Sequence, residues 1–247
     1  MARGGNQIIP RPPDFRPGGP NPWIGRLTPA PVHPERVERV LSELAAGLRP
    51  TVPNEVMHPP VLTATRSAAV LIPLFVTAHE TRVLLTRRSG HMRNHRGEVA
   101  FPGGRVDDGE APVDAALRET NEEIGLQREQ VRVIGQIEPL WTLMSKAEVI
   151  PFVGVVDTPL PPLAHNPIEV ERIFDVGLLE LIEEDCYHEE IWDRPFGNSR
   201  LHFFDVEGDT IWGATGRLLH RLLTLLADPD ALRPTPSGPS ATFVSER

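Results

Sequence analysis

Residues 104–126 read GRVDDGEAPVDAALRETNEEIGL, and the spacing inside this stretch predicts both a helix and a chemical site. Apolar residues recur at helical spacing, Pro112 suits the first turn of a helix, and Gly125 suits its end. We therefore predict a helix over residues 112–124. One stripe of this helix is expected to be buried, and it consists of Val113, Ala116, Leu117, Thr120 and Ile124.

Three glutamates gather on another arc of the same helix. Glu119, Glu122 and Glu123 are helical neighbours, and carboxylates this close repel one another unless a cation or an arginine compensates them. Oxygen ligands of this kind suit Mg²⁺ or Mn²⁺, the ions that bridge to phosphate oxygens. Arg118 is placed to orient one of the carboxylates. Taken alone, such a cluster is more often a solvated acidic face.

The preceding segment carries the opposite charge. Residues 81–97 contain five arginines (82, 87, 88, 93 and 96), two histidines and no acid. Arginines bind terminal phosphates, and metal held by carboxylates neutralises the scissile ones. Gly103 and Gly104 lie between the two halves, where the missing side chains allow the backbone to approach a ligand closely. A basic loop next to an acidic helix therefore predicts a site for a phosphate ester.

Apolar runs alternate with helical patterns over the rest of the central segment. Strands are expected over residues 68–77, 82–86, 98–101, 131–137, 149–156 and 201–206, and further helices over 175–184 and 211–226. There is no internal repeat. The alternation implies an α/β domain with a sheet covered by helices.

Prolines are unevenly distributed along the 247-residue chain, since 13 of the 27 lie in the first 60 residues. We expect a Pro-rich N-terminal extension over 1–63, a folded domain over 64–226 and a flexible tail over 227–247. Residues 1–34 are predicted to be an extended, largely unpacked arm, with a partner-binding segment around Trp23 as the alternative. One helix is expected near 35–48.

Composition excludes several classes of function. With 40% hydrophobic and 24% charged residues the chain is typical of a soluble globular protein, and no apolar run approaches the length that spans a membrane. A net charge of −9 argues against nucleic acid as a partner. The lone Cys186 excludes an intrachain disulfide framework and fits a cytoplasmic location. The oligomeric state stays open, a homodimer included.

Two motifs carry a resemblance to a known family. The pattern Gly104-x5-Glu110-x7-Arg118-Glu119-x2-Glu122-Glu123-x-Gly125-Leu126 resembles the 23-residue Nudix box. The pattern Leu84-Leu85-Thr86-x-Arg88-Ser89-x3-Arg93-x3-Gly97-x3-Phe101-Pro102-Gly103-Gly104 is similar to a segment associated with Nudix hydrolases of coenzyme A, and so is the run from Trp212 to Thr215. The resemblance covers about residues 64–226 and implies a Nudix-type α/β/α sandwich with a mixed sheet.

The resemblance also implies an activity and its residues. Glu119, Glu122 and Glu123, with the Gly104 carbonyl, would bind Mg²⁺ or Mn²⁺, and Glu119, Glu123 and Arg118 would be catalytic. The implied substrate-binding residues are Arg88, Ser89, Arg93, Gly97, Phe101 and Gly103. The reaction would cleave the diphosphate of coenzyme A or acyl-CoA to 3′,5′-ADP and (acyl-)4′-phosphopantetheine, by in-line attack of water on one phosphorus. Glu119 and Glu123 are candidates for the general base, and Glu169 is a third.

Other readings of the same motifs remain. ADP-ribose or another nucleoside diphosphate derivative is the main alternative substrate. The SQPWPFPxS-like stretch of the NADH branch is absent, and the Tyr that dinucleoside polyphosphate members place soon after the box is absent too. A catalytically silent domain that senses a ligand is the rival from another class. The complete set of glutamates argues against it.

Overall fold

The computed structural model describes residues 3–24, 36, 39, 42, 66–78, 80–92, 95–142, 147–194 and 197–227. The strands, in chain order, are β1 (Gly4–Gly5), β2 (Arg16–Pro17), β3 (Arg66–Val76), β4 (Thr81–Arg88), β5 (Val99–Ala100), β6 (Gly103–Arg105), β7 (Val131–Gln136), β8 (Leu140–Thr142), β9 (Ala147–Val156), β10 (Val170–Gly177), β11 (Tyr187–Arg194) and β12 (Gly197–Ile211). The described helices are α2 (Pro112–Ile124) and α3 (Gly213–Ala227), with 3₁₀ turns η1 (Arg128–Gln130) and η2 (Glu180–Ile182).

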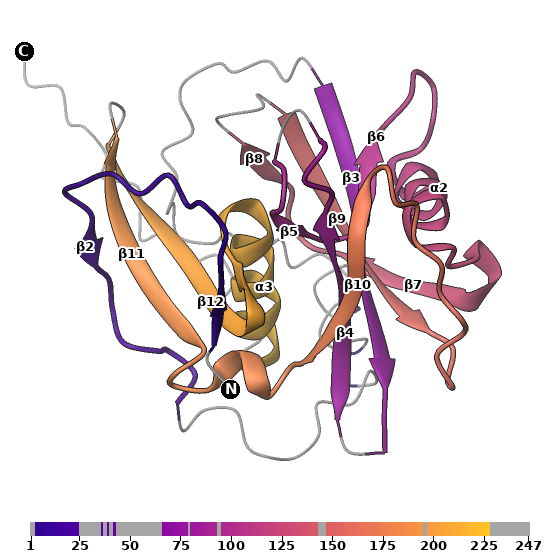
Figure 1. Ribbon diagram of the computed structural model, residues 1–247. Helices are drawn as coiled ribbons and strands as arrows, with labels where there is room; N and C mark the ends of the chain where they lie inside the picture. The colour runs from indigo at the N-terminus through magenta and orange to yellow at the C-terminus, as the bar shows by residue number, and fades with distance from the viewer. Residues whose placement is uncertain are drawn as a thin grey trace, which may run out of the picture.

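These elements form two sheets with α3 between them and α2 on the outer face of the larger sheet (Figure 1). The larger sheet has the order β10-β4-β3-β9-β7, and β5, β6 and β8 pair with β4, β3 and β9. It is mixed, because β3 and β9 run parallel while their other neighbours are antiparallel. The predicted α/β/α sandwich with a mixed sheet is confirmed.

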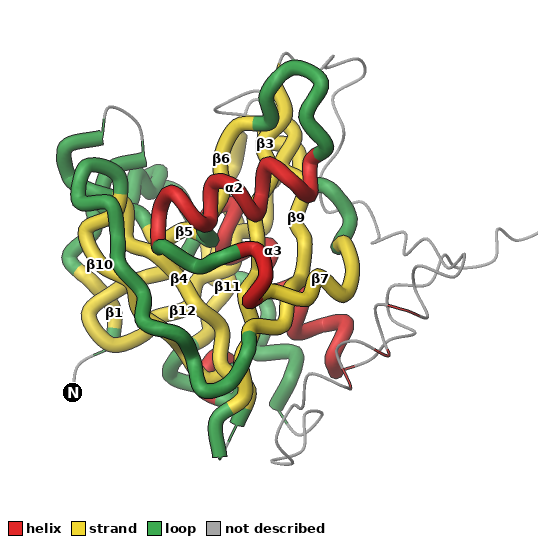
Figure 2. Tube along the Cα trace, turned by 90° about the vertical axis from the view of Figure 1, so that its right-hand side faces the viewer, coloured by secondary structure: helices red, strands yellow, loops and turns green. Residues whose placement is uncertain are grey.

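Helix α2 has the predicted bounds and lies against the larger sheet (Figure 2). Its apolar stripe packs on residues of that sheet, among them Leu71 and Leu84. Ala116, Leu117, Thr120 and Ile124 are buried as expected, whereas Val113 is only partly buried. The Thr120 hydroxyl donates a hydrogen bond of 2.6 Å to the Ala116 carbonyl, so a polar residue is satisfied within the buried stripe. The helix ends at Gly125, whose φ of 73° is left-handed.

Helix α3 packs against both sheets. One continuous apolar cluster contains its leucines together with residues of both sheets, for example Leu85 of β4 and Phe204 of β12. None of the described helices is long and apolar enough to cross a membrane.

The smaller sheet has the order β1-β12-β11-β2, so the N-terminal residues cover both of its edges. Trp23 lies 2% exposed in the core, with its ring 4.7 Å from that of Tyr187 and 6.1 Å from that of Phe204. Residues 3–24 are extended and mostly exposed, as predicted, but Trp23 is buried and two short segments pair with the smaller sheet, so the arm is more firmly attached than expected. Its prolines exclude regular structure along most of the segment, yet extended backbone still pairs at two short places.

Other parts of the terminal predictions are not tested. Within 35–48, only Arg36, Arg39 and Ser42 are described, and each is helical. The rest of that helix and the tail over 228–247 lie outside the described residues. The division at residues 63 and 226 stays a prediction.

The helix expected over 175–184 is wrong. Residues up to Gly177 belong to β10, which pairs with β4 so that Val176 lies opposite Val83, and only the turn η2 follows. Hydrogen bonds to a strand distant in the sequence outweigh the local pattern here. The six predicted strands correspond to β3, β4, β5, β7, β9 and β12, whereas β1, β2, β6, β8, β10 and β11 were not expected.

Candidate active site

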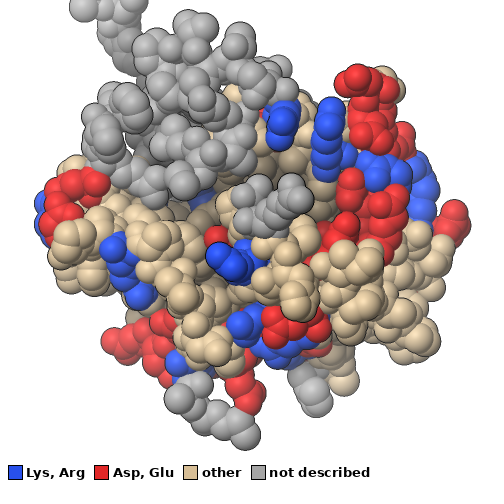
Figure 3. All heavy atoms as spheres, turned by 45° about the horizontal axis from the view of Figure 1, so that its top comes forward, with Lys and Arg blue, Asp and Glu red and all other residues tan. Residues whose placement is uncertain are grey.

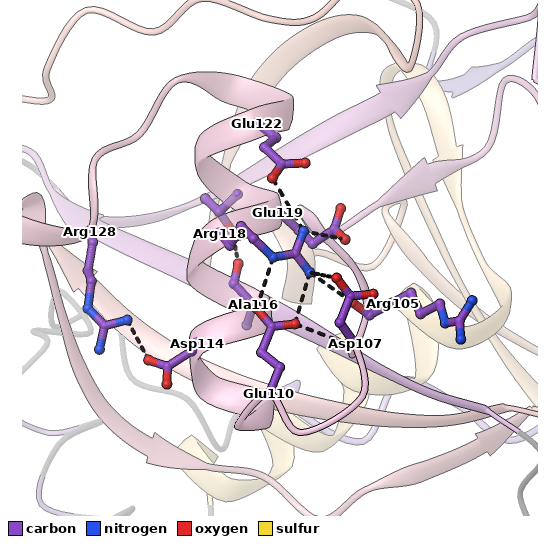
Figure 4. A network of polar contacts seen from close by, with 10 residues as sticks. Arg105, Asp107, Glu110, Asp114, Ala116, Arg118, Glu119, Glu122 and Arg128 are labelled. Atoms are coloured by element: carbon purple, nitrogen blue, oxygen red, sulfur yellow. Dashed lines mark hydrogen bonds and ion pairs between the residues drawn. The ribbon is translucent and has the colours of Figure 1, made fainter.

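Charged side chains of both signs crowd around α2, on the right-hand side of Figure 3. They come from three elements: α2 itself, the turn that leads into it from β6, and the end of β4. The polar contacts around Arg118 appear in Figure 4.

Arg118 holds the acidic arc in place. Its guanidinium makes a bidentate pair with Glu110, at 2.9 Å from Nε and 3.0 Å from Nη2. Its Nη1 also donates to Glu119 at 3.0 Å and to Glu122 at 3.3 Å. The Arg118 hydrogen bonds lower the pKa of the Glu110 carboxyl to about 2. Sequence reasoning gave Glu110 no role beyond its place in the box, although its fixed spacing from Arg118 was the available signal.

Glu123 is the buried member of the arc, at 4% exposure. Its Oε2 accepts a hydrogen bond of 3.1 Å from the Gly103 N–H, and its Oε1 lies 3.8 Å from Nη1 of Arg88. Burial raises the pKa of Glu123 to about 7, and the nearby charges of Glu169 and Glu119 act in the same direction. The opposing contacts with Gly103 and Arg88 are too weak to compensate.

Glu119 lies directly over the backbone of Gly104. A Cβ at position 104 would lie 2.4 Å from the Glu119 carboxyl carbon, so only glycine admits this placement. Burial also raises the pKa of Glu119, despite its contact with Arg118. At Gly103, a Cβ would lie 2.3 Å from the Ala69 carbonyl oxygen, and φ is +146°. Both glycines are therefore required by close approach, as expected.

Among the described arginines of the basic segment, Arg88 reaches this site. Arg88 ends β4, and its backbone pairs with Glu98 and Gly97 across the loop at 2.9 and 3.0 Å. Its buried Nε has no hydrogen-bond partner among the described residues. Arg82 is paired with Glu80 and Asp175, away from the glutamates.

Two other predicted substrate-binding residues lie in different surroundings. Ser89 is buried and donates its N–H to the Glu169 carbonyl at 2.8 Å, which brings the loop carrying Glu169 to the end of β4. Phe101 lies in the core around α3 at 3% exposure, so its part in substrate binding stays a prediction. Arg93 lies outside the described residues.

The donor chemistry of this site fits a hard divalent cation. Carboxylates and a backbone carbonyl are the ligands that Mg²⁺ and Mn²⁺ prefer. Glu123 in particular is a buried carboxylate that lacks a close cationic partner, since Arg88 is 3.8 Å away. Two of the three glutamates are turned to Arg118, and in the described part of the chain no three acidic, His or Cys side chains already form a coordinating group.

Gly104→Ala is expected to lower kcat about a hundredfold with the fold retained, because the new methyl displaces only the end of the Glu119 side chain. Gly90→Ala is the matched control, since nothing lies within 4 Å of its Cβ position. Steady-state rates and melting temperatures of both variants check this. Full activity of the Gly104 variant would show that the position of Glu119 is unimportant.

The chain is similar to proteins of one family. The NUDIX domain model matches residues 65–183. Nudix hydrolase 3 of Caenorhabditis elegans is 34% identical over 200 residues, which cover 71% of this chain and 80% of that protein. The relative named "Uncharacterized Nudix hydrolase NudL", from Photorhabdus laumondii, is 40% identical over 161 residues, or 64% of this chain and 83% of that protein.

Solved structures also match. A C. elegans Ap4A hydrolase in a binary complex is 25% identical with a TM-score of 0.40, covering 49% of this chain and 85% of that chain. DR0079 from Deinococcus radiodurans is 15% identical with a TM-score of 0.44, covering 68% and 89%. Scores this low carry no argument about the substrate.

The glutamate-bearing helix α2 and strands β3 to β10 lie within the residues that the NUDIX model matches, whereas α3, β11 and β12 follow them. With relatives of this identity and coverage, the chain belongs to the Nudix hydrolase family. It is a hydrolase of the diphosphate bond in nucleoside diphosphate derivatives, and such enzymes generally use divalent cations such as Mg²⁺ or Mn²⁺.

Proposed function

We propose that the protein hydrolyses the diphosphate bond of coenzyme A or acyl-CoA, releasing 3′,5′-ADP and (acyl-)4′-phosphopantetheine. The observation that carries the proposal is Arg88, whose guanidinium lies beside Glu123 with a buried, unpartnered Nε. Arg88 belongs to the 84–104 pattern, and coenzyme A bears a 3′-phosphate in addition to its diphosphate. A guanidinium that lies beside the glutamates and still has an unpartnered Nε is suited to binding one of these phosphates.

The roles of the residues follow from their environments. A divalent cation, when bound by Glu119, Glu122, Glu123 and the Gly104 carbonyl, would neutralise charge on the diphosphate. Glu123 is a candidate to accept the proton of the attacking water, because its buried carboxylate lies beside the Gly103 N–H and Arg88. Arg118 would orient Glu119 through their 3.0 Å contact. Glu169 is an alternative base. It lies close enough to Glu123 for its charge to raise the pKa of that residue.

Chromatography of the products tests the substrate. The purified protein is incubated with coenzyme A, acetyl-CoA, ADP-ribose, NADH and a dinucleoside tetraphosphate, first with Mg²⁺ and then with Mn²⁺. We expect 3′,5′-ADP from coenzyme A at the highest kcat/KM. No 3′,5′-ADP under either ion, with turnover of ADP-ribose, would replace coenzyme A by the alternative substrate. No turnover of any compound would favour a silent ligand-sensing domain.

Arg88→Gln is expected to raise KM for coenzyme A about tenfold to a hundredfold, because a charged contact with a phosphate is lost in a partly buried site. Steady-state kinetics with coenzyme A and with dephospho-CoA measure the effect. A loss confined to coenzyme A would assign Arg88 to the 3′-phosphate, and an equal loss on both would assign it to the diphosphate. Arg128→Gln, on the exposed turn η1, is the control. An unchanged KM for both substrates would remove Arg88 from the site.

A cytoplasmic location and a homodimer also stay predictions. Size-exclusion chromatography with light scattering tests the homodimer.

A further inference from the structure

A second charged network lies on the opposite face of the larger sheet, centred on Asp209 of β12. The Asp209 side chain is completely buried, and Arg87, Arg172 and Gln7 contact it. Arg87 Nη1 lies 3.1 Å from Oδ1, Gln7 Nε2 donates to the same oxygen at 2.8 Å, and Arg172 pairs with Oδ2. A buried carboxylate is tolerated only when it is paired in this way. Asp209 and Gln7 both lie outside residues 65–183, which the NUDIX model matches.

The network joins the N-terminal arm to the strand that ends in Arg88. Gln7 accepts a hydrogen bond from the Thr210 N–H at 3.0 Å, while its amide nitrogen donates to Asp209. Asn6 accepts another, of 3.1 Å, from Nη2 of Arg87. The arm therefore contacts both the buried carboxylate and one of the arginines that compensate it.

Strand geometry links this network to the glutamates. On β4, Val83 and Leu85 face the core around α3, whereas Leu84 faces α2. Side chains alternate along a strand, so Arg87 continues the α3 side and Arg88 continues the α2 side. The contacts confirm this, because Arg87 binds Asp209 while Arg88 lies next to Glu123.

The neighbouring strand β10 also has an arginine that contacts Asp209. Arg172 of β10 lies opposite Arg87, and Val170 lies opposite Arg88, with a register irregularity between them. Glu169 immediately precedes this point, and its carbonyl accepts the Ser89 N–H. The two arginines on Asp209 thus hold together the two strand ends from which Arg88 and Glu169 project.

We propose that Asp209, Arg87 and Gln7 are positioning residues that set the end of β4 and so place Arg88 for binding a substrate phosphate. This inference rests on the role of Arg88 in the proposed function. It makes the N-terminal arm, far away in the sequence, part of the phosphate-binding apparatus.

Gln7→Ala and Asp209→Asn test the proposal, with Ile8→Ser as the matched control because Ile8 is 96% exposed on the same arm. Hydrogen–deuterium exchange of the full-length protein is followed over residues 84–100, which include the amides of Arg88, Ser89 and Gly97. We expect exchange there to accelerate about tenfold in both variants, since the strand end is no longer held, and to be unchanged in the control.

Kinetics with coenzyme A and Mg²⁺ supply a second measurement. KM is expected to rise about fivefold to tenfold with kcat changed less than about twofold, because Arg88 binds phosphate equally in the ground and transition states. A general loss of stability would not give this split. Wild-type exchange and wild-type KM in both folded variants would overturn the proposal. If Asp209→Asn does not fold, Gln7→Ala alone decides.

Failure of the proposed function is distinguishable from failure of this inference. Turnover of coenzyme A by the wild-type protein tests the proposed function. The exchange rates of the variants relative to wild type test the positioning role, and they need no substrate.

Discussion

Glu123→Gln is expected to lower kcat by about three orders of magnitude while leaving the protein folded, which is the scale of a lost general base. Glutamine keeps the size of the side chain and an oxygen that can accept the Gly103 N–H, so the local packing survives. What is lost is the buried carboxylate next to Arg88. Initial rates at saturating coenzyme A with Mg²⁺, together with circular dichroism, measure the effect.

Two further variants provide comparisons for this result. Glu119→Gln is expected to lower turnover by orders of magnitude as well. Glu129→Gln, on the exposed turn η1, should leave the rate unchanged. Full activity in the Glu123 or the Glu119 variant would remove that residue from the mechanism.

The same Glu123 substitution should stabilise the protein in buffer free of divalent cations. The pKa of Glu123 is raised from 4.5 to about 7, so in the folded state it holds its proton to higher pH than in the unfolded state. Stability is therefore lost as pH rises from about 4.5 to 7 and stays low above it, at a cost of about 3 kcal/mol. Glutamine carries no such cost, so the variant should melt higher than wild type at pH 8.

Melting curves with EDTA at pH 8 and pH 5 test this prediction. At pH 5 the two proteins should differ little, because Glu123 is protonated in the fold. An equal difference at both pH values would show that burial of the charge is not the cause.

Trp23→Ala is the substitution expected to destabilise the protein most, by about 3–5 kcal/mol, as is usual when a fully buried aromatic ring is removed from a core. The ring contacts Tyr187 and Phe204 of the smaller sheet and His220 of α3, so its loss leaves a cavity between these elements. Chemical denaturation of the full-length protein measures the change in the free energy of unfolding.

Ile24→Ala is the matched control, since Ile24 is the adjacent residue on the arm and is 57% exposed. It should change the stability by less than about 0.5 kcal/mol. If Trp23→Ala unfolds at the wild-type denaturant concentration, the N-terminal arm does not stabilise the domain in solution.

The elements that were predicted correctly have local signals. Helix α2 has its predicted bounds because Pro112, the helical period and Gly125 all act within one short segment. The close packing of the two glycines before it was also expected, since a residue without a side chain signals close approach wherever it lies. The helical period alone predicts that the three glutamates lie on one arc. It does not predict the contacts that two of them make with Arg118.

The elements that were missed have partners distant in the chain. The helix expected over residues 175–184 overlaps the end of β10. Those residues form a strand because they pair with β4, and no pattern within 175–184 indicates that pairing. Asp209 has no motif around it, and its importance is visible only where β4, β10 and the arm meet. The burial of Trp23 is of the same kind, since it depends on Tyr187 and Phe204.

Local periodicity and residue chemistry were therefore sufficient for the α/β class and the glutamates of the helix, and the resemblance of two motifs indicated the family, because those properties depend on neighbours in the chain. The docking of the Pro-rich arm, the buried network of Asp209 with Arg87 and Arg172 and the raised pKa of Glu123 were not accessible in this way. Each depends on which groups exclude water or compensate charge across the folded molecule, and folding brings those groups together from remote segments.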